Sequence, residues 1–188
     1  MTTSKQTYRY KVEESILGNI KDEYSLSEHE YYCIYSFYVT YSMCGNQSFK
    51  KRNFTDYGWP ENSIRYPNLK KVLNDILKFK ESEVFQFTEK DDLKTQFEEN
   101  NLLDVYKLNV DTERFVIGKT NEKNQYLKLF HRIRNGFAHG KFKLRLSSNN
   151  EKMVVIQDDN GNNVTARIVL RLSTILRFIC AVDIKGLI

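Results

Sequence analysis

The sequence predicts a mainly α-helical protein with a small antiparallel β insert, a hairpin, before a C-terminal helix. Apolar residues recur three or four positions apart, the spacing of helices, up to about residue 137. The spacing then changes to the alternation of strands, over residues 142–146, 153–157 and 164–169. Asn160-Gly161, in the stretch DDNGNN, is a typical hairpin turn between the last two of these strands.

A first helix is predicted over residues 27–43. Ser27 and Glu30 match a capping box, in which each side chain caps a backbone N–H group at the helix start. The following residues are apolar on nearly all sides, so this helix is predicted to be central in the core or shared with a partner chain. It is expected to stop near Gly45.

Residues 45–67 are the loosest part of the chain and contain both of its prolines. Lys50, Lys51 and Arg52 lie there between two phenylalanines. Basic groups interleaved with aromatic rings can hold a single nucleic-acid strand by charge and stacking, so these three residues are candidate RNA contacts. The alternative interpretation is a solvated loop anchored by a few aromatic side chains.

Four more helices complete the prediction. Residues 68–79 have helical spacing with Asn68 as the N-cap, and residues 91–106 have a weaker pattern. Residues 121–135 carry an apolar stripe that continues to Phe137. After the hairpin, Ser173 is predicted to cap the last helix.

Length and composition fit one domain over residues 1–188. The net charge of +5 and the pI near 9.0 suit a polyanionic partner such as RNA. The 12 Tyr and 12 Phe leave three uses open, namely a core, an interface or base-stacking surfaces.

Neither a cofactor nor a membrane segment is expected. The three cysteines are far apart and form no CxxC pair, so neither a zinc site nor a disulfide framework is predicted, and a reducing, cytoplasmic location is favoured. The N-terminus is polar and lacks the apolar core of a signal peptide. The longest mostly apolar run, residues 31–43, is too short to span a bilayer.

The chemistry is expected in the segment HRIRNGFAHG, residues 131–140. On an uninterrupted helix Arg134 and His139 lie about 140° apart and cannot both face one substrate. Asn135-Gly136 is a natural place for the helix to end or bend, because both residues tolerate positive φ. Such a break is expected to bring His139 back toward Arg134, and His131, one turn earlier, is a candidate accessory residue.

An arginine beside a histidine suits a phosphodiester. The guanidinium of Arg134 can pair with two phosphate oxygens and stays charged. The imidazole of His139 can take or give a proton near pH 7, and the amide of Asn135 can orient it or bind the ribose or phosphate. In RNA the 2′-OH is already next to the scissile phosphate, so this chemistry needs no metal.

Each of these residues also has a structural interpretation. Arg134 can be a surface arginine that favours the helix dipole, and Asn135-Gly136 can be merely a C-cap. His139 and His131 can be ordinary loop and helix-surface histidines. His29, in the first turn of the first helix, is predicted to be structural.

The segment LFHRIRNGFAHGKF resembles the signature of the HEPN superfamily (higher eukaryotes and prokaryotes nucleotide-binding). In that signature an arginine, often followed by asparagine, precedes a histidine by a few residues after a helix. The later stretch MVVIQDDNGNNVTARIVLRLSTILRFI resembles the C-terminal part of small bacterial HEPN proteins. The resemblance is specific over residues 120–188 and implies a helical bundle that commonly dimerises, so that two motifs share one cleft.

By position, the resemblance makes Arg134, Asn135 and His139 the catalytic residues of a metal-independent endoribonuclease. Many members of the superfamily act as toxins or in defence against phage. Cleavage by 2′-OH attack would leave a 2′,3′-cyclic phosphate and a 5′-hydroxyl. The alternative is a catalytically inert HEPN module that binds RNA, a nucleotide or a protein, although such modules typically lack the motif.

The resemblance also implies partners. A homodimer is expected, with the Tyr-rich segment 31–41 and the apolar face around Phe130 and Phe137 as the surface to bury. An antitoxin or a defence protein is a further expected partner. HEPN toxins paired with a nucleotidyltransferase antitoxin usually carry a Tyr two residues after the motif histidine. Here that residue is Lys141, which argues against modification by an antitoxin and is instead a candidate RNA contact.

Overall fold

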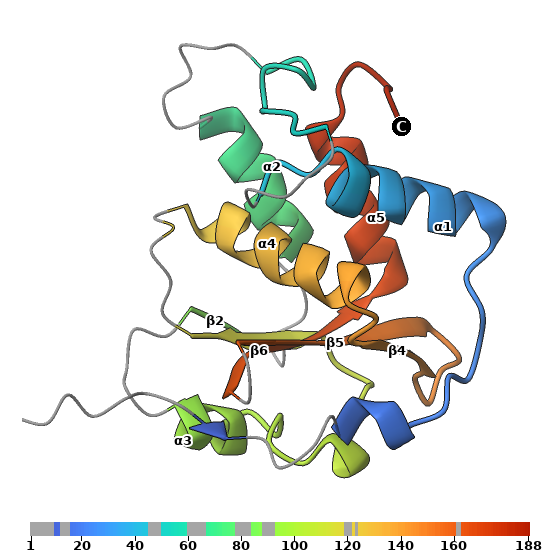
Figure 1. The fold of residues 1–188 in the computed structure, drawn as a ribbon, viewed down its shortest axis with the longest axis vertical. Helices are drawn as coiled ribbons and strands as arrows, with labels where there is room; N and C mark the ends of the chain where they lie inside the picture. The colour runs from blue at the N-terminus through green and yellow to red at the C-terminus, as the bar shows by residue number, and fades with distance from the viewer. Residues whose placement is uncertain are drawn as a thin grey trace, which may run out of the picture.

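The chain folds around one twisted sheet with helices on both of its faces. The computed structural model describes residues 10–11, 16–44, 50–59, 67–77, 84–87, 93–118, 122, 124–160 and 163–188. Figure 1 views the sheet edge-on, with helices α1, α2, α4 and α5 on one face and α3 on the other. The helices are α1 (Glu28–Ile34), α2 (Pro67–Leu77), α3 (Leu93–Glu99), α4 (Gln125–Ala138) and α5 (Leu172–Val182).

Three shorter helical segments accompany them: the 3₁₀ helices η1 (Ile16–Asn19) and η3 (Val105–Lys107) and the π-helix η2 (Tyr35–Thr40). The strands are β1 (Tyr10–Lys11), β2 (Val84–Phe87), β3 (Arg114–Ile117), β4 (Phe142–Leu146), β5 (Lys152–Asn160) and β6 (Asn163–Arg171).

The described strands make a six-stranded sheet in the order β2-β3-β6-β5-β4, with β1 paired to β6. Strands β4, β5 and β6 form the predicted antiparallel meander, in which Leu144 faces Val154 and Val155 faces Val169. Strand β3 adds to β6 antiparallel, and β2 adds to β3 in parallel. Strands β5 and β6 pair up to Asn160 and Asn163, so Asn160, predicted as a turn residue, is instead the last residue of β5. The two residues between the strands, 161 and 162, lie outside the described residues.

The prediction of a mainly α fold is wrong, because the fold is a mixture of α and β structure. The sheet is not a late insert either, since β1, β2 and β3 come before α4 in the chain. Strand β3 was missed because all four of its residues are buried, so its sequence RFVI shows no alternation of apolar and polar residues.

The sheet separates two hydrophobic clusters, and successive residues of a strand contribute to opposite ones. In β3, Phe115 and Ile117 join the cluster under α1, α2, α4 and α5, whereas Val116 joins the cluster on the side of α3. In β5, Ile156 and Val155 divide in the same way. This period of two is the geometry of a strand covered on both faces.

The first helix begins as predicted. Ser27 accepts from the backbone N–H of Glu30 at 3.2 Å, and the Glu30 carboxylate accepts from the backbone N–H of Ser27 at 2.7 Å, which confirms the capping box. The regular α-helix ends at Ile34 and continues as the wider π-helix η2 to Thr40. Gly45, where a stop was expected, lies outside the described residues.

The apolar surface predicted for a partner chain is largely used within the chain. Phe130 and Phe137 are only 2% and 1% exposed, and their rings pack against rings of η2, β4 and α5. In the Tyr-rich segment 31–41, Tyr31 and Tyr32 are exposed, at 52% and 56%, but Phe37 and Tyr38 are buried. Two tyrosines of α1 therefore remain as apolar surface.

Several predicted helix boundaries are corrected. Helix α2 begins at Pro67 rather than after a cap at Asn68, because proline fits the first helical position, where no N–H donor is needed. Helix α3 spans Leu93–Glu99 and is much shorter than the predicted 91–106. Helix α5 begins at Leu172, so Ser173 lies inside it and is not its cap.

Helix α4 packs unusually close to the sheet at Gly136. A β-carbon added to this residue would lie 2.2 Å from Cγ2 of Ile156, a fully buried residue of β5. This distance is far shorter than a van der Waals contact, so either the helix or the strand would have to move. Gly136 therefore allows helix and sheet to approach, and it has no role in breaking the helix.

We expect Gly136→Ala to destabilise the protein by about 1–3 kcal/mol, because overpacking a rigid core outweighs the gain of about 0.5–1 kcal/mol that alanine brings to a helix. Urea unfolding of the variant measures this loss. Ala138→Gly, at an exposed position of the same turn, is the control and should cost about 1 kcal/mol or less. A Gly136→Ala variant as stable as the parent would contradict the close packing.

Candidate active site

The motif lies at the C-terminal end of α4, and the helix does not break inside it. Helix α4 runs through Asn135 and Gly136 to Ala138, with His139 as its C-cap residue. Gly140 follows with a positive φ of 65°, and the N–H groups of Gly140 and Lys141 bond back to the carbonyls of Phe137 and Gly136 at 3.3 and 2.8 Å. This pair of bonds is a Schellman motif. The expected break at Asn135-Gly136 is therefore wrong, and the glycine that ends the helix is Gly140.

Because the helix is continuous, the motif residues are spread over its outer arc. At about 100° per residue, His131, Asn135 and His139 follow one another along one side, and Arg134 lies about 140° from His139. His139 is exposed and Arg134, Asn135 and His131 are half-buried, whereas the opposite side of the helix is buried. Within one chain, Arg134 and His139 thus project from the two edges of the arc.

Arg134 and Asn135 are joined by a hydrogen bond between their side chains. Nη1 of Arg134 donates to Oδ1 of Asn135 at 2.9 Å. Nε of Arg134 is inaccessible to solvent and has no hydrogen-bond partner in the described part of the chain. No carboxylate among the described residues pairs with this guanidinium, so its charge is not neutralised within the described part of the chain.

The other cations near the end of α4 are paired. Arg132 donates to Asp158 of β5, which also accepts from Oγ1 of Thr165 at 2.9 Å. Lys141, a candidate RNA contact, forms an ion pair with Asp159. These side chains hold α4 and its following turn to the sheet, and Lys141 has an alternative partner to any phosphate.

His131 is half-buried among charged groups of both signs. Burial and the guanidinium of Arg132 lower its pKa, Arg134 acts in the same direction, and Asp158 and Glu122 oppose them. A lowered pKa keeps this imidazole neutral at neutral pH. As the candidate accessory residue, His131 can therefore accept a hydrogen bond beside Arg134 without adding to the positive charge.

The basic segment 50–52 lies near the other end of the same surface. Burial and the charge of Glu122 raise the pKa of the Cys44 thiol to about 12, whereas the charges of Lys51 and Arg134 act in the opposite direction. Sγ of Cys44 in turn donates to the backbone carbonyl of Leu127 in α4 at 3.5 Å. The structure thus places Cys44, which precedes the segment in the chain, against the N-terminal part of α4.

The three basic side chains of the segment differ in their freedom. Lys50 and Lys51 are exposed. The Arg52 guanidinium lies 3.9 Å from the ring centroid of Tyr41 and 5.5 Å from that of Tyr57. Such cation–π contacts anchor the loop, so of the three candidate RNA contacts Lys50 and Lys51 are the ones open to a ligand.

Tyr35 is a neighbour of the motif that the sequence did not single out. Its hydroxyl donates to the carbonyl of Phe137 at 3.3 Å, and its ring packs edge-on against the Phe137 ring at 5.9 Å. The same carbonyl accepts from the N–H groups of His139 and Gly140, so Tyr35 contacts the turn that carries the motif histidine. The four-residue spacing of Tyr31 and Tyr35 was the available signal, because such pairs stack on a helix.

A family model described as HEPN pEK499 p136 matches residues 5–183 of the chain. The chain therefore belongs to this HEPN family, which extends the resemblance from residues 120–188 to nearly the whole sequence. Family membership indicates a function related to nucleotides or RNA. Neither the curated proteins nor the solved structures contain a match.

Two absences hold for the described residues. No helix among them is both long and apolar enough to cross a bilayer. No group of three or more His, Cys, Asp or Glu side chains among them has the arrangement of a metal site.

Proposed function

We propose that this protein is a metal-independent endoribonuclease that cleaves RNA by attack of the 2′-OH on the adjacent phosphate. Arg134 binds and neutralises the phosphate, His139 acts as the acid or base, and Asn135 orients the guanidinium or contacts the ribose. His131 is an accessory group. HEPN domains are often ribonucleases, and many of them are toxins.

The observation that carries the proposal is the contrast between Arg134 and its neighbours. Arg132 and Lys141 are neutralised by Asp158 and Asp159, whereas Arg134 has the neutral amide of Asn135 as its partner and no carboxylate among the described residues. Burying a charge is costly unless it is paired, so a half-buried guanidinium with no carboxylate beside it has the more to gain from an anionic ligand. An arginine with free donors next to an exposed histidine is suited to a phosphodiester.

The continuous helix supports a two-chain site. Arg134 and His139 of one chain are separated by about 7.5 Å along the axis of α4 and by about 140° around it. A two-fold symmetric homodimer with α4 at its interface would place motif residues of both chains around one phosphate, because an isologous contact repeats the same patch on both sides. Such a dimer would have one cleft lined by two arginines and two histidines.

Lys50 and Lys51 are proposed to hold the RNA strand beyond the scissile phosphate. Both are exposed. The cellular role we propose is that of a toxin or phage-defence effector in the cytoplasm, with an antitoxin or defence protein as its regulator.

We expect the purified protein to cut single-stranded RNA equally well with and without EDTA. The reason is that 2′-OH attack needs charge neutralisation and proton transfer, which the arginine and histidine supply. Mass spectrometry of the products should find 2′,3′-cyclic phosphate and 5′-hydroxyl ends, and RNA with 2′-O-methyl groups should resist cleavage. Activity that EDTA abolishes and magnesium restores would contradict the proposed chemistry, and binding without cleavage would favour an inert HEPN module.

A further inference from the structure

We propose that Tyr31 is a stacking platform for an unpaired nucleobase next to the scissile phosphate. This inference deepens the proposed function, on which it rests, because it names a residue of α1 that selects single-stranded RNA. The residue lies outside the motif, on a different helix, and has no role in the chemical step.

The first observation is a series of aromatic rings that leads from the surface to the motif. The Tyr31 ring stacks on the Tyr35 ring, with centroids 4.1 Å apart and an interplanar angle of 21°. Tyr35 packs edge-on against Phe137, which in turn lies 4.7 Å from the ring of Phe142 in β4. The inner members of the series belong to the hydrophobic core or pack against it, so the outermost ring rests on a rigid support.

The second observation is that one face of Tyr31 is free. The residue is 52% exposed even though Tyr35 covers one side of its ring. An exposed aromatic face, flat and parallel to a second ring, can extend the stack by one base. Stacking tolerates any base because every base has a π face, but it requires that the base be unpaired or splayed out of a helix.

The third observation is the position of the stack relative to His139. The Tyr35 hydroxyl bonds to the carbonyl of Phe137, which also accepts from the N–H groups of His139 and Gly140. The platform is thereby fixed to the turn that presents the motif histidine. A base on Tyr31 would belong to a nucleotide close to the phosphate that His139 and Arg134 act upon, whereas Lys50 and Lys51 are near the opposite end of α4.

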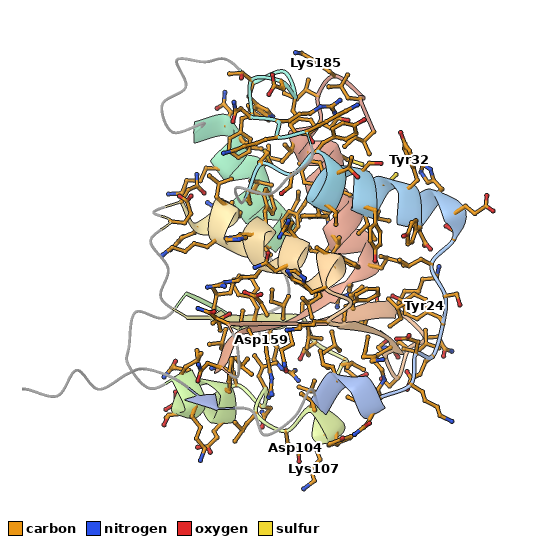
Figure 2. The ribbon with its side chains drawn as sticks, viewed as in Figure 1. Tyr24, Tyr32, Asp104, Lys107, Asp159 and Lys185 are labelled. Atoms are coloured by element: carbon orange, nitrogen blue, oxygen red, sulfur yellow. The ribbon has the colours of Figure 1, made fainter. Side chains whose placement is uncertain are left out.

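The neighbouring Tyr32 provides a matched control. It is 56% exposed and lies on the same helix, but no ring contact with another described residue supports it. Figure 2 shows it on the side of α1 turned away from the sheet. Tyr31→Ala and Tyr32→Ala therefore both remove one exposed tyrosine of α1, but only Tyr31→Ala removes a ring of the stack.

The test is the affinity of the full-length protein for a short, fluorescently labelled single-stranded oligoribonucleotide. His139→Ala serves as the background, so that the probe is not cut. We expect Tyr31→Ala to weaken binding by about 5- to 150-fold, the range measured when a base-stacking aromatic residue is replaced by alanine. Tyr31→Phe should bind nearly as the background does, and so should Tyr32→Ala.

A series of oligonucleotides with a single abasic nucleotide locates the stacked base. An abasic nucleotide at one position should weaken binding to the His139→Ala protein that retains Tyr31. The same abasic nucleotide should weaken binding no further when Tyr31→Ala is added, because both changes remove the same contact. Equal affinity of Tyr31→Ala and its background would overturn the proposal, and so would additive losses at every position. A Tyr31→Ala variant that turns from dimer to monomer in sedimentation would also overturn it, since Tyr31 would then bind a second copy.

These outcomes are separate from those of the proposed function. A parent protein that binds RNA through Tyr31 but never cuts it would refute the endoribonuclease and leave the stacking site intact. A parent protein that cuts RNA, with an affinity that does not depend on Tyr31, would refute the stacking site alone.

Discussion

His139→Ala should lower the rate of RNA cleavage by about 100- to 10,000-fold, which is the usual contribution of a general acid or base. The side chain of His139 is exposed, and no hydrogen bond from its imidazole is present among the described residues. The helix end is closed by backbone bonds to Gly140 and Lys141, which the substitution leaves in place. The loss should therefore be one of rate, measured in single-turnover cleavage of a labelled RNA.

His29→Ala is the control for this experiment. It also removes an exposed imidazole, in the first turn of α1, where Sγ of Cys33 lies 3.7 Å from the ring. Cleavage by His29→Ala should equal that of the parent. Both variants should unfold within about 0.5 kcal/mol of the parent, as surface substitutions usually do. If purified His139→Ala cuts RNA as fast as the parent, the motif is not the ribonuclease centre.

Local signals in the sequence predicted the elements that are held by local interactions. The capping box at Ser27 and Glu30 and the meander of β4, β5 and β6 are both of this kind, since their partners lie a few residues apart or across a short turn. Strands β2 and β3 pair in parallel across an intervening helix, and β3 is buried on both faces. Neither feature produces an alternation of apolar and polar residues in a four-residue segment. For this reason the sequence predicted a mainly helical fold where the structure has a central sheet.

The motif residues could be chosen from the sequence, but their arrangement could not. Gly136 was interpreted as a helix breaker because glycine tolerates positive φ, yet its use is a close approach to Ile156, a residue of a strand that follows later in the chain. The pairing of Arg132 and Lys141 with two aspartates of β5 is also a long-range effect. Which basic residues of this segment meet an aspartate of β5, and which do not, depends on how α4 is placed along the sheet.

The continuous helix bears directly on how many chains would form the proposed active site. A base and an acid are both useful when the 2′-OH attacks and the 5′ oxygen leaves, and one exposed motif histidine supplies only one of them. His131 is near Arg134, but it lies about 12 Å from His139 along the helix axis, too far for both to act on one phosphate. A second copy of His139 from a symmetry-related chain would supply the missing group.

We therefore expect a mixed dimer, with one parent chain and one His139→Ala chain, to retain far less than half of the parental cleavage rate. The reason is that a composite site needs both histidines, whereas two independent sites would lose only one of two. Two different affinity tags allow the mixed dimer to be purified, and light scattering establishes that it is a dimer at micromolar concentration. The parent chain paired with His29→Ala is the control and should cut at the full rate. Retention of half the rate would mean that each chain cuts alone, and the shared cleft would be rejected even if the protein is an endoribonuclease. A monomeric parent protein would also count against the shared cleft.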